Sequence, residues 1–354
     1  MIHFTAGPSQ VYPTLPQYLQ EAIQEDVMSI SHRGDAFMDI YAHMDKGLRA
    51  LLNVPEDYQI FVFSSATEIW ERISENCIEK ESFHLVNGNF SNSFRKIVRL
   101  AGKEAKSHEI EEGLGFDIES IDVPASSELI ATIANESSTG VMLPAKDLAT
   151  LRKHYPEKLI VSDAVSIVPT WEGRIEDLDG LYFSVQKGFG LPAGLAVLIM
   201  SPRMLARGLE LEAKGQMVGT YHRFSALLEK SKKNQTPATP NVLGIYLLGK
   251  VCEDMVQKLP AIKQANEEKY SLLCNWIEKH PDLEFAIDNP EHRSNTVVVI
   301  KHNYTDGKAK IEALAAKGFA ISTGYGKYKG SQFRIANFPA TSVEDMKALI
   351  AAFG

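Results

Sequence analysis

The residues best suited to chemistry in this sequence are a lysine and an aspartate that each follow an apolar run. Lys187 lies in the segment 184–190, where Gly188 follows it and leaves space around its amine. Asp163 ends the β-branched run 159–163, which is typical of a buried strand. A lysine amine can form a Schiff base with an aldehyde, and a carboxylate can keep a ring nitrogen protonated.

A pyridoxal phosphate site requires both of these groups, because the lysine binds the cofactor aldehyde and the aspartate makes the ring an electron acceptor. A simpler interpretation competes with this one. The lysine would be solvated after a strand, and the aspartate would cap a turn. For Lys187 and Asp163 taken alone, the simpler interpretation is the better supported. The choice between a pyridoxal phosphate site and the simpler interpretation therefore depends on which residues lie at the other predicted strand ends.

Strands and helices alternate along the first two thirds of the chain. This alternation is typical of an α/β fold with a mostly parallel sheet, covered by helices on both faces, whose functional groups gather at the carboxyl ends of the strands. Phe90, Ser137, Asp163 and Lys187 each stand at or just after a predicted strand end, so we expect them to meet at one edge of one sheet. The predicted strands include 58–63, 83–86, 105–110, 129–134, 159–164 and 195–200.

Beyond residue 200 the pattern becomes mainly helical up to 259, with a break at 234–240 where two prolines exclude a helix interior. A helix over 261–280 comes next, followed by a mixture of strands and helices. The sequence thus predicts three parts. They are an N-terminal segment near the active site (1–14), a large domain (15–255) and a smaller C-terminal α+β domain (256–354).

Composition narrows the class of protein. A formal net charge of -8 over 354 residues argues against a general nucleic-acid binder, which needs clustered lysine and arginine. The cysteines Cys77, Cys252 and Cys274 are too far apart for a zinc or redox motif, and the histidines lack metal-ligand spacing, so no metal is expected. No segment resembles a signal peptide or reaches the length of a membrane span. We expect a cytoplasmic protein that binds neither nucleic acid nor membranes.

The motifs at the strand ends, taken together, resemble those of the fold-type I pyridoxal phosphate enzymes of aminotransferase class V. The resemblance extends over nearly the whole chain, and the loop Ser31-His32-Arg33 is its most specific part. It implies a large domain with a seven-stranded, mostly parallel sheet, pyridoxal 5'-phosphate as cofactor, and a homodimer with shared active sites. The matching stretches are 7–8, 29–34, 87–90, 135–137, 163, 186–187, 236–237, 293–295 and 334.

The resemblance also assigns residues to the cofactor. Lys187 would form the Schiff base and carry protons during transamination, and Asp163 would pair with the ring nitrogen. Phe90 would stack on the ring where the family usually has tryptophan, and Ser137 would hydrogen-bond near the ring hydroxyl. The residues expected to hold the cofactor phosphate are Ala66, Thr67 and Gln186, with Gln235 and Thr236 reaching across from the second subunit.

The predicted substrates are an amino acid and a 2-oxo acid. Arg334 would clamp the α-carboxylate through two hydrogen bonds, while His32 and Arg33 of the partner subunit would bind a substrate phosphate. These roles imply transfer of an amino group between phosphoserine and 2-oxoglutarate, a reaction of serine biosynthesis. The family has a second His-Arg pair shortly before the carboxylate-binding arginine. Here that stretch, 323–330, lacks the pair and offers Lys327, a point charge without the planar fork of arginine.

Two other functions stay open on the sequence. The first is a class V transaminase that acts on serine or alanine with glyoxylate or pyruvate, and the absence of the second His-Arg pair favours it. An interaction protein on the same scaffold, without cofactor, is an alternative of a different class, and it would lack the near-visible absorbance of a lysine-bound cofactor. We prefer the phosphoserine reaction, because a site built for a dianion should keep at least one arginine, and this sequence keeps Arg33.

Overall fold

A seven-stranded sheet forms the centre of the large domain in the computed structural model, which describes residues 1–354. Neighbouring strands are parallel except at β10, which runs antiparallel to both β9 and β2. The prediction of a seven-stranded, mostly parallel sheet is confirmed. In spatial order the strands are β2 (Gln59–Phe63), β10 (Ala196–Met200), β9 (Gly180–Ser184), β8 (Leu159–Asp163), β5 (Leu129–Ile133), β3 (Glu81–Val86) and β4 (Glu104–Glu109).

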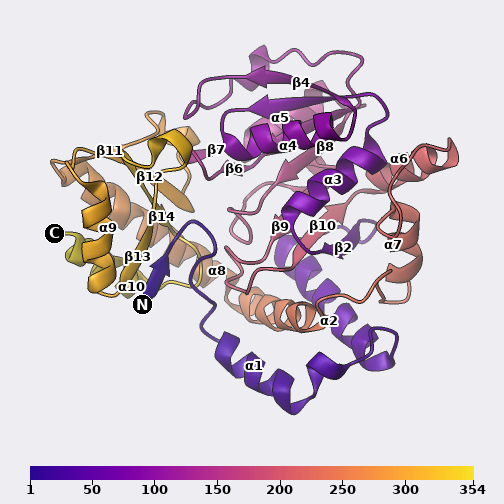
Figure 1. Ribbon diagram of the computed structural model, residues 1–354, viewed down its shortest axis with the longest axis horizontal. Helices are drawn as coiled ribbons and strands as arrows, with labels where there is room; N and C mark the ends of the chain where they lie inside the picture. The colour runs from indigo at the N-terminus through magenta and orange to yellow at the C-terminus, as the bar shows by residue number, and fades with distance from the viewer.

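Helices cover both faces of this sheet (Figure 1). Successive residues of a strand point to opposite faces, so Ile60 and Val62 enter one apolar core while Phe61 and Phe63 enter the other. The first core packs against α1 (Leu15–Gln24), α2 (Asp35–Leu52), α5 (Ala145–His154) and the first part of α8 (Val242–Lys279). The second packs against α3 (Ala66–Cys77), α4 (Asn89–Leu100), α6 (Pro202–Ala213) and α7 (Phe224–Ser231).

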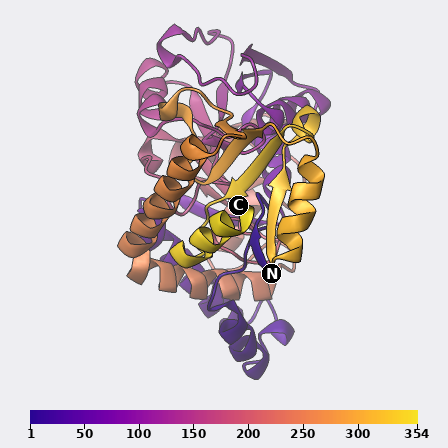
Figure 2. The ribbon, with the colours of Figure 1, turned by 90° about the vertical axis from the view of Figure 1, so that its left-hand side faces the viewer.

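A second sheet forms the smaller part of the molecule, and Figure 2 shows it with both chain termini on the same side. The N-terminal strand β1 (Ile2–Phe4) joins its edge by pairing in parallel with β13, although no strand was predicted there from the sequence. Three residues are too few to show the two-residue period of a strand. The other strands are β11 (Leu283–Phe285), β12 (Val297–His302), β13 (Phe319–Thr323) and β14 (Gln332–Ala336), covered by α9 (Gly307–Ala316) and α10 (Val343–Phe353).

The helix α8 joins the helical stretch that was predicted up to 259 and the helix predicted over 261–280 into one continuous helix, which contains Pro260. A proline inside a helix removes one hydrogen bond and crowds the preceding turn. Packing at both ends offsets this loss: Met255 lies in the large core, and Leu273 and Ile277 lie in the core of the small sheet. The proposed domain boundary at residue 255 stays a prediction that falls within this helix.

Short elements complete the chain. The hairpin of β6 (Asn135–Glu136) and β7 (Val141–Met142) follows β5 at the carboxyl edge of the large sheet. Single turns of 3-10 helix occupy Val27–Ser29, Ile118–Ser120, Ile175–Asp177, Pro290–His292 and Gly326–Tyr328. None of the helices contains an apolar stretch long enough to span a bilayer.

Candidate active site

A cavity of about 280 Å³ lies at the carboxyl edge of the large sheet. It receives side chains from the loops after five strands of the large sheet, from the N-terminal segment, and from β14 and the loop before it in the small sheet. The predicted residues that line it are Ala66, Thr67, Phe90, Ser137, Asp163, Gln186, Lys187 and Arg334. The fold therefore brings together residues that lie far apart in the sequence.

Lys187 lies in the loop after β9, with only 8 % of its surface exposed. Its Nζ is 3.4 Å from the Ser137 Oγ and 5.3 Å from the centre of the Phe90 ring. Burial lowers the pKa of this amine to about 8, and the nearby Arg334 guanidinium acts in the same direction. The lowered pKa increases the fraction of neutral amine near neutral pH, and a neutral amine with so few partners is suited to nucleophilic attack on an aldehyde.

A second buried lysine provides a useful comparison. Lys269 of α8 is fully buried, and burial lowers its pKa to about 7. However, its Nζ donates hydrogen bonds of 2.8 Å to the backbone oxygens of both Phe338 and Thr341. Lys269 therefore fastens α8 to the loop before α10, whereas the amine of Lys187 is free to react. Burial alone does not separate the two lysines, but their hydrogen bonds do.

Asp163 is the last residue of β8 and is buried against the cavity. One of its carboxylate oxygens accepts the N–H of Val165 at 2.9 Å, which leaves the other oxygen for a ligand. Burial raises the pKa of this carboxyl to about 6, and the nearby Lys187 opposes the rise. A second cation beside Asp163, such as a protonated ring nitrogen, would favour the ionised carboxylate further.

The N-terminus of α3 offers a place for a phosphate at the same cavity, because its first-turn N–H groups have no partners within the helix. The N–H of Ala66 already donates to the Ser184 Oγ at 2.8 Å, and the N–H of Glu68 donates to the Ser65 Oγ. The first-turn N–H of Thr67 stays free for an anion. Ser184 and Ser65 were not predicted from the sequence, since single serines carry no recognisable motif.

Arg334 reaches the cavity from β14 and is held by two backbone oxygens. Its Nε donates to Thr323 at 2.9 Å and its Nη1 to Ser137 at 3.1 Å. Its guanidinium lies 5.2 Å from the centre of the Tyr325 ring, and that ring lies 5.6 Å from Phe90. These contacts fix the guanidinium and leave its Nη2 for an incoming carboxylate. Tyr325 was missed, although it lies in the stretch that lacks the His-Arg pair.

The arrangement fits pyridoxal phosphate. It combines a free lysine amine, a buried carboxylate, an aromatic face at Phe90 and a helix N-terminus that can receive a phosphate. Two further observations agree. The Gln186 Oε1 is buried without a hydrogen-bond partner. A side chain at Gly7 would place its Cβ 2.6 Å from the Lys187 Cε, so the N-terminal segment must be bare there to admit the lysine.

Five predicted residues lie outside this cavity, and their roles stay predictions. His32, Arg33, Gln235 and Thr236 form a second group in which Arg33 connects two loops. Its Nη1 donates to the Thr236 backbone oxygen at 2.7 Å and to the Gln235 Oε1 at 3.2 Å. Lys327 is exposed, and its Nζ pairs with the Glu112 carboxylate at 2.8 Å.

Comparison with known proteins agrees with this geometry. A phosphoserine aminotransferase of Corynebacterium glutamicum is 30% identical over 359 residues, which cover 99% of this chain and 92% of that protein. The crystal structure of a phosphoserine aminotransferase from Cytophaga hutchinsonii is 41% identical, with a TM-score of 0.97 over 99% of this chain and 97% of that one.

A more distant structure shares the fold alone. An aspartate aminotransferase from Thermus thermophilus is 22% identical, with a TM-score of 0.87 over 100% of this chain and 98% of that one. The family profile for aminotransferase class V matches residues 4–331, which is most of the sequence. This chain therefore belongs to the class V aminotransferases, transaminases that use pyridoxal phosphate.

Proposed function

We propose that this protein transfers an amino group between phosphoserine and 2-oxoglutarate, and forms phosphoserine from 3-phosphohydroxypyruvate and glutamate in serine biosynthesis. The observation that carries the proposal is the full-length similarity, at 41% identity, to the phosphoserine aminotransferase of Cytophaga hutchinsonii. The half-buried guanidinium of Arg334 at the cavity supports it, because every substrate and product of this reaction has a carboxylate beside the reacting carbon.

Pyridoxal phosphate, when bound, supplies an aldehyde that reacts with amines and a ring that accepts electrons. The Nζ of Lys187 would hold and move the proton that is removed from the substrate carbon. A pKa of about 8 lets its Nζ exchange a proton near neutral pH. Asp163 would hold the ring nitrogen and favour its protonated form, and Phe90 would present an aromatic face to the ring. Ser137 lies beside the Lys187 amine and limits where it can move.

Arg334 orients the substrate in both halves of the proposed reaction. Its Nε and Nη1 are already hydrogen-bonded to Thr323 and Ser137, so little conformational freedom is lost when a carboxylate binds. Its contact with the Ser137 backbone also joins the small sheet to the loop that carries the Lys187 partner. The binding of a substrate carboxylate is therefore coupled in space to the position of the reacting amine.

We also propose that two copies of the chain share their active sites. His32, Arg33, Gln235 and Thr236 lie outside the cavity of their own chain, which supports a role in the cavity of a partner. In this arrangement Arg33 has two tasks. It binds the substrate phosphate, and it supports the loop that contacts the cofactor phosphate.

The cytoplasm is the compartment that we propose for this reaction. The cysteines Cys77 and Cys252 are buried free thiols, and burial raises the pKa of each. Such thiols do not depend on an oxidising environment, which agrees with a reducing compartment.

Mixed dimers test the sharing of active sites. We would combine a Lys187→Ala chain with an Arg33→Ala chain and measure transamination of phosphoserine. If the sites are shared, each mixed dimer contains one intact site, and an equal mixture recovers roughly one quarter of the wild-type activity. If Lys187 and Arg33 act within one chain, the mixture recovers none, and the shared-site proposal is wrong.

A single-turnover experiment tests the substrate. The cofactor-loaded enzyme is mixed with phosphoserine, serine, alanine or glutamate at equal concentrations, and the loss of the lysine-bound cofactor absorbance is followed. We expect fast loss with phosphoserine and glutamate, and Arg33→Ala should slow the phosphoserine reaction more than the glutamate reaction. Equal or faster reaction of serine or alanine would favour a transaminase for unphosphorylated amino acids, consistent with the missing His-Arg pair.

A further inference from the structure

The helix α4 begins directly beside the cavity, and its second residue is Phe90. The first N–H groups of a helix need acceptors from outside the helix. Here the N–H of Asn89 donates to the Ser138 Oγ at 2.9 Å, and those of Phe90 and Ser91 donate to the Glu136 carboxylate at 3.3 and 2.9 Å. The start of α4 is thus held by the short hairpin after β5.

Glu136 supplies most of this cap from a buried position. Only 1 % of its surface is exposed, and it forms no ion pair. Its carboxylate also accepts the backbone N–H of Ser138 at 3.3 Å and the hydroxyls of Ser138 and Ser91 at 2.6 and 3.0 Å. Every contact is a donor, so the site requires a group that accepts at both oxygens. The positive end of the helix dipole also favours a negative charge here.

The turn before α4 packs tightly against the Glu136 side chain. A Cβ at Gly88 would lie 2.4 Å from the Glu136 Cγ, so the turn before α4 can approach the carboxylate only because it has no side chain. The neighbours Asn135 and Ser137 both line the cavity, whereas Glu136 contacts the helix. One short strand therefore serves the cavity on one side and holds α4 on the other.

The charge of Glu136 also acts on the cavity. The groups that influence the Lys187 amine are Asp163, Arg334 and Glu136, and the carboxylate of Glu136 favours the protonated amine. It favours the charged form of Arg334 as well. Glu136 therefore offsets part of the effect of burial on both cations, although it contacts neither of them directly.

We propose that Glu136 is a positioning residue for the cofactor: by capping α4 it holds the Phe90 ring in place, and its charge balances the cations of the cavity. This inference rests on the proposed stacking of Phe90 on pyridoxal phosphate. It assigns the acidic residue of the Asn135-Glu136-Ser137 stretch a task that is separate from those of its two neighbours.

The substitution Glu136→Gln tests the proposal with little change of shape. An amide has only one accepting oxygen, so its NH₂ group must face an N–H or hydroxyl donor whichever way it is oriented. We expect the dissociation constant for pyridoxal phosphate, measured by absorbance titration, to rise about tenfold. We also expect the pH at which the lysine-bound cofactor changes its absorbance to move downward, because the removed charge favoured the protonated nitrogen.

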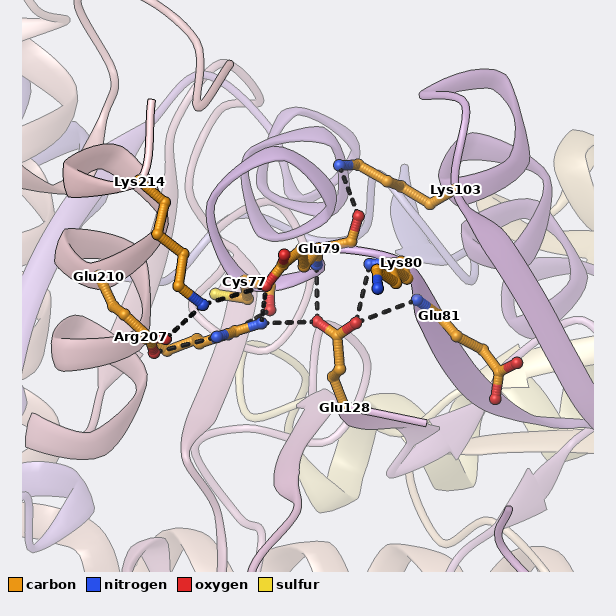
Figure 3. Close-up of polar contacts among 9 residues, drawn as sticks. All are labelled: Cys77, Glu79, Lys80, Glu81, Lys103, Glu128, Arg207, Glu210 and Lys214. Carbon is orange, nitrogen blue, oxygen red and sulfur yellow. Dashed lines mark hydrogen bonds and ion pairs between the residues drawn. The ribbon is translucent and has the colours of Figure 1, made fainter. Parts of the chain in front are cut away.

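The chain offers a matched control at the opposite edge of the sheet. Glu128 accepts the backbone N–H groups of Glu79, Lys80 and Glu81 at 2.6, 2.7 and 3.3 Å, and also contacts Arg207 at 2.8 Å (Figure 3). Glu128→Gln should lower the stability of the cofactor-free and cofactor-loaded protein alike, with no change in cofactor affinity or absorbance. Glu136→Gln should instead reduce the stabilisation that the cofactor provides.

Two more variants make the outcome decisive. Ser138→Ala removes one part of the cap and leaves the carboxylate, so it should weaken cofactor binding in the same direction by a few fold. It replaces the first test if Glu136→Gln does not fold. Phe90→Ala examines the stacking itself: if it leaves cofactor affinity unchanged, the stacking proposal is wrong. If Phe90→Ala weakens binding while Glu136→Gln and Ser138→Ala do not, only the inference about Glu136 is overturned.

Discussion

Replacing Lys187 by methionine should stabilise the cofactor-free protein, because folding buries this amine with only one hydrogen bond, 3.4 Å long. Burial lowers its pKa from 10.5 to about 8. At roughly 1.4 kcal/mol per pKa unit, this difference corresponds to a penalty of about 3 kcal/mol. The folded pKa lies below the unfolded one, so the penalty is complete below pH 8 and disappears as the pH rises to 10.5.

Urea unfolding of the cofactor-free proteins measures this effect. At pH 7 we expect the free energy of unfolding of Lys187→Met to exceed that of the wild type by up to about 3 kcal/mol, and at pH 10 by about 1 kcal/mol or less. Lys153→Met, an exposed position on α5, serves as the control and should show no such pH dependence. Equal stability of wild type and Lys187→Met at pH 7, or a gain that does not change with pH, would refute the reasoning.

Three further substitutions test other parts of the cavity. Gly7→Ala forces a Cβ to within 2.6 Å of the Lys187 side chain, at a φ of +141° that disfavours alanine. The absorbance of the lysine-bound cofactor should therefore fall sharply. An unchanged spectrum would show that the N-terminal segment can move away from Lys187. Asp163→Asn should lower kcat, measured by steady-state kinetics, at least about a hundredfold while the cofactor still binds. A near-normal kcat would contradict the proposed role of Asp163 at the ring nitrogen. Arg334→Lys should raise KM about tenfold for both glutamate and phosphoserine, and a change confined to one substrate would contradict a shared carboxylate site.

Much of the fold and of the cavity could be predicted from the sequence, because the informative residues stand at strand ends. A parallel sheet brings such ends to one edge, so Phe90, Ser137, Asp163 and Lys187 meet in the structure as their order along the chain indicated. The sequence pattern could not show that the amine of Lys187 is free to react while that of Lys269 is held by hydrogen bonds. That distinction depends on the hydrogen bonds of Lys269, which come from a distant loop.

The remaining features depend on contacts that no local pattern contains. Pro260 lies inside α8 because cores at both ends hold the helix, and no window of the sequence reports this support. The contact of Lys327 with the substrate stays a prediction. The ion pair between its amine and Glu112, in a loop far away in the sequence, is a contact that no local pattern contains. Tyr325 and Glu136 act through packing and capping across elements, so their types alone give no signal.

The most direct test of the site is to find which lysine holds the cofactor. The enzyme, loaded with pyridoxal phosphate, is reduced with borohydride to make the linkage permanent, digested and analysed by mass spectrometry. We predict that the reduced cofactor is attached to the peptide containing Lys187 and to no other, and that Lys269, whose amine is hydrogen-bonded to Phe338 and Thr341, is not labelled. Attachment at another lysine, or no attachment, would contradict the assignment of this cavity as the active site.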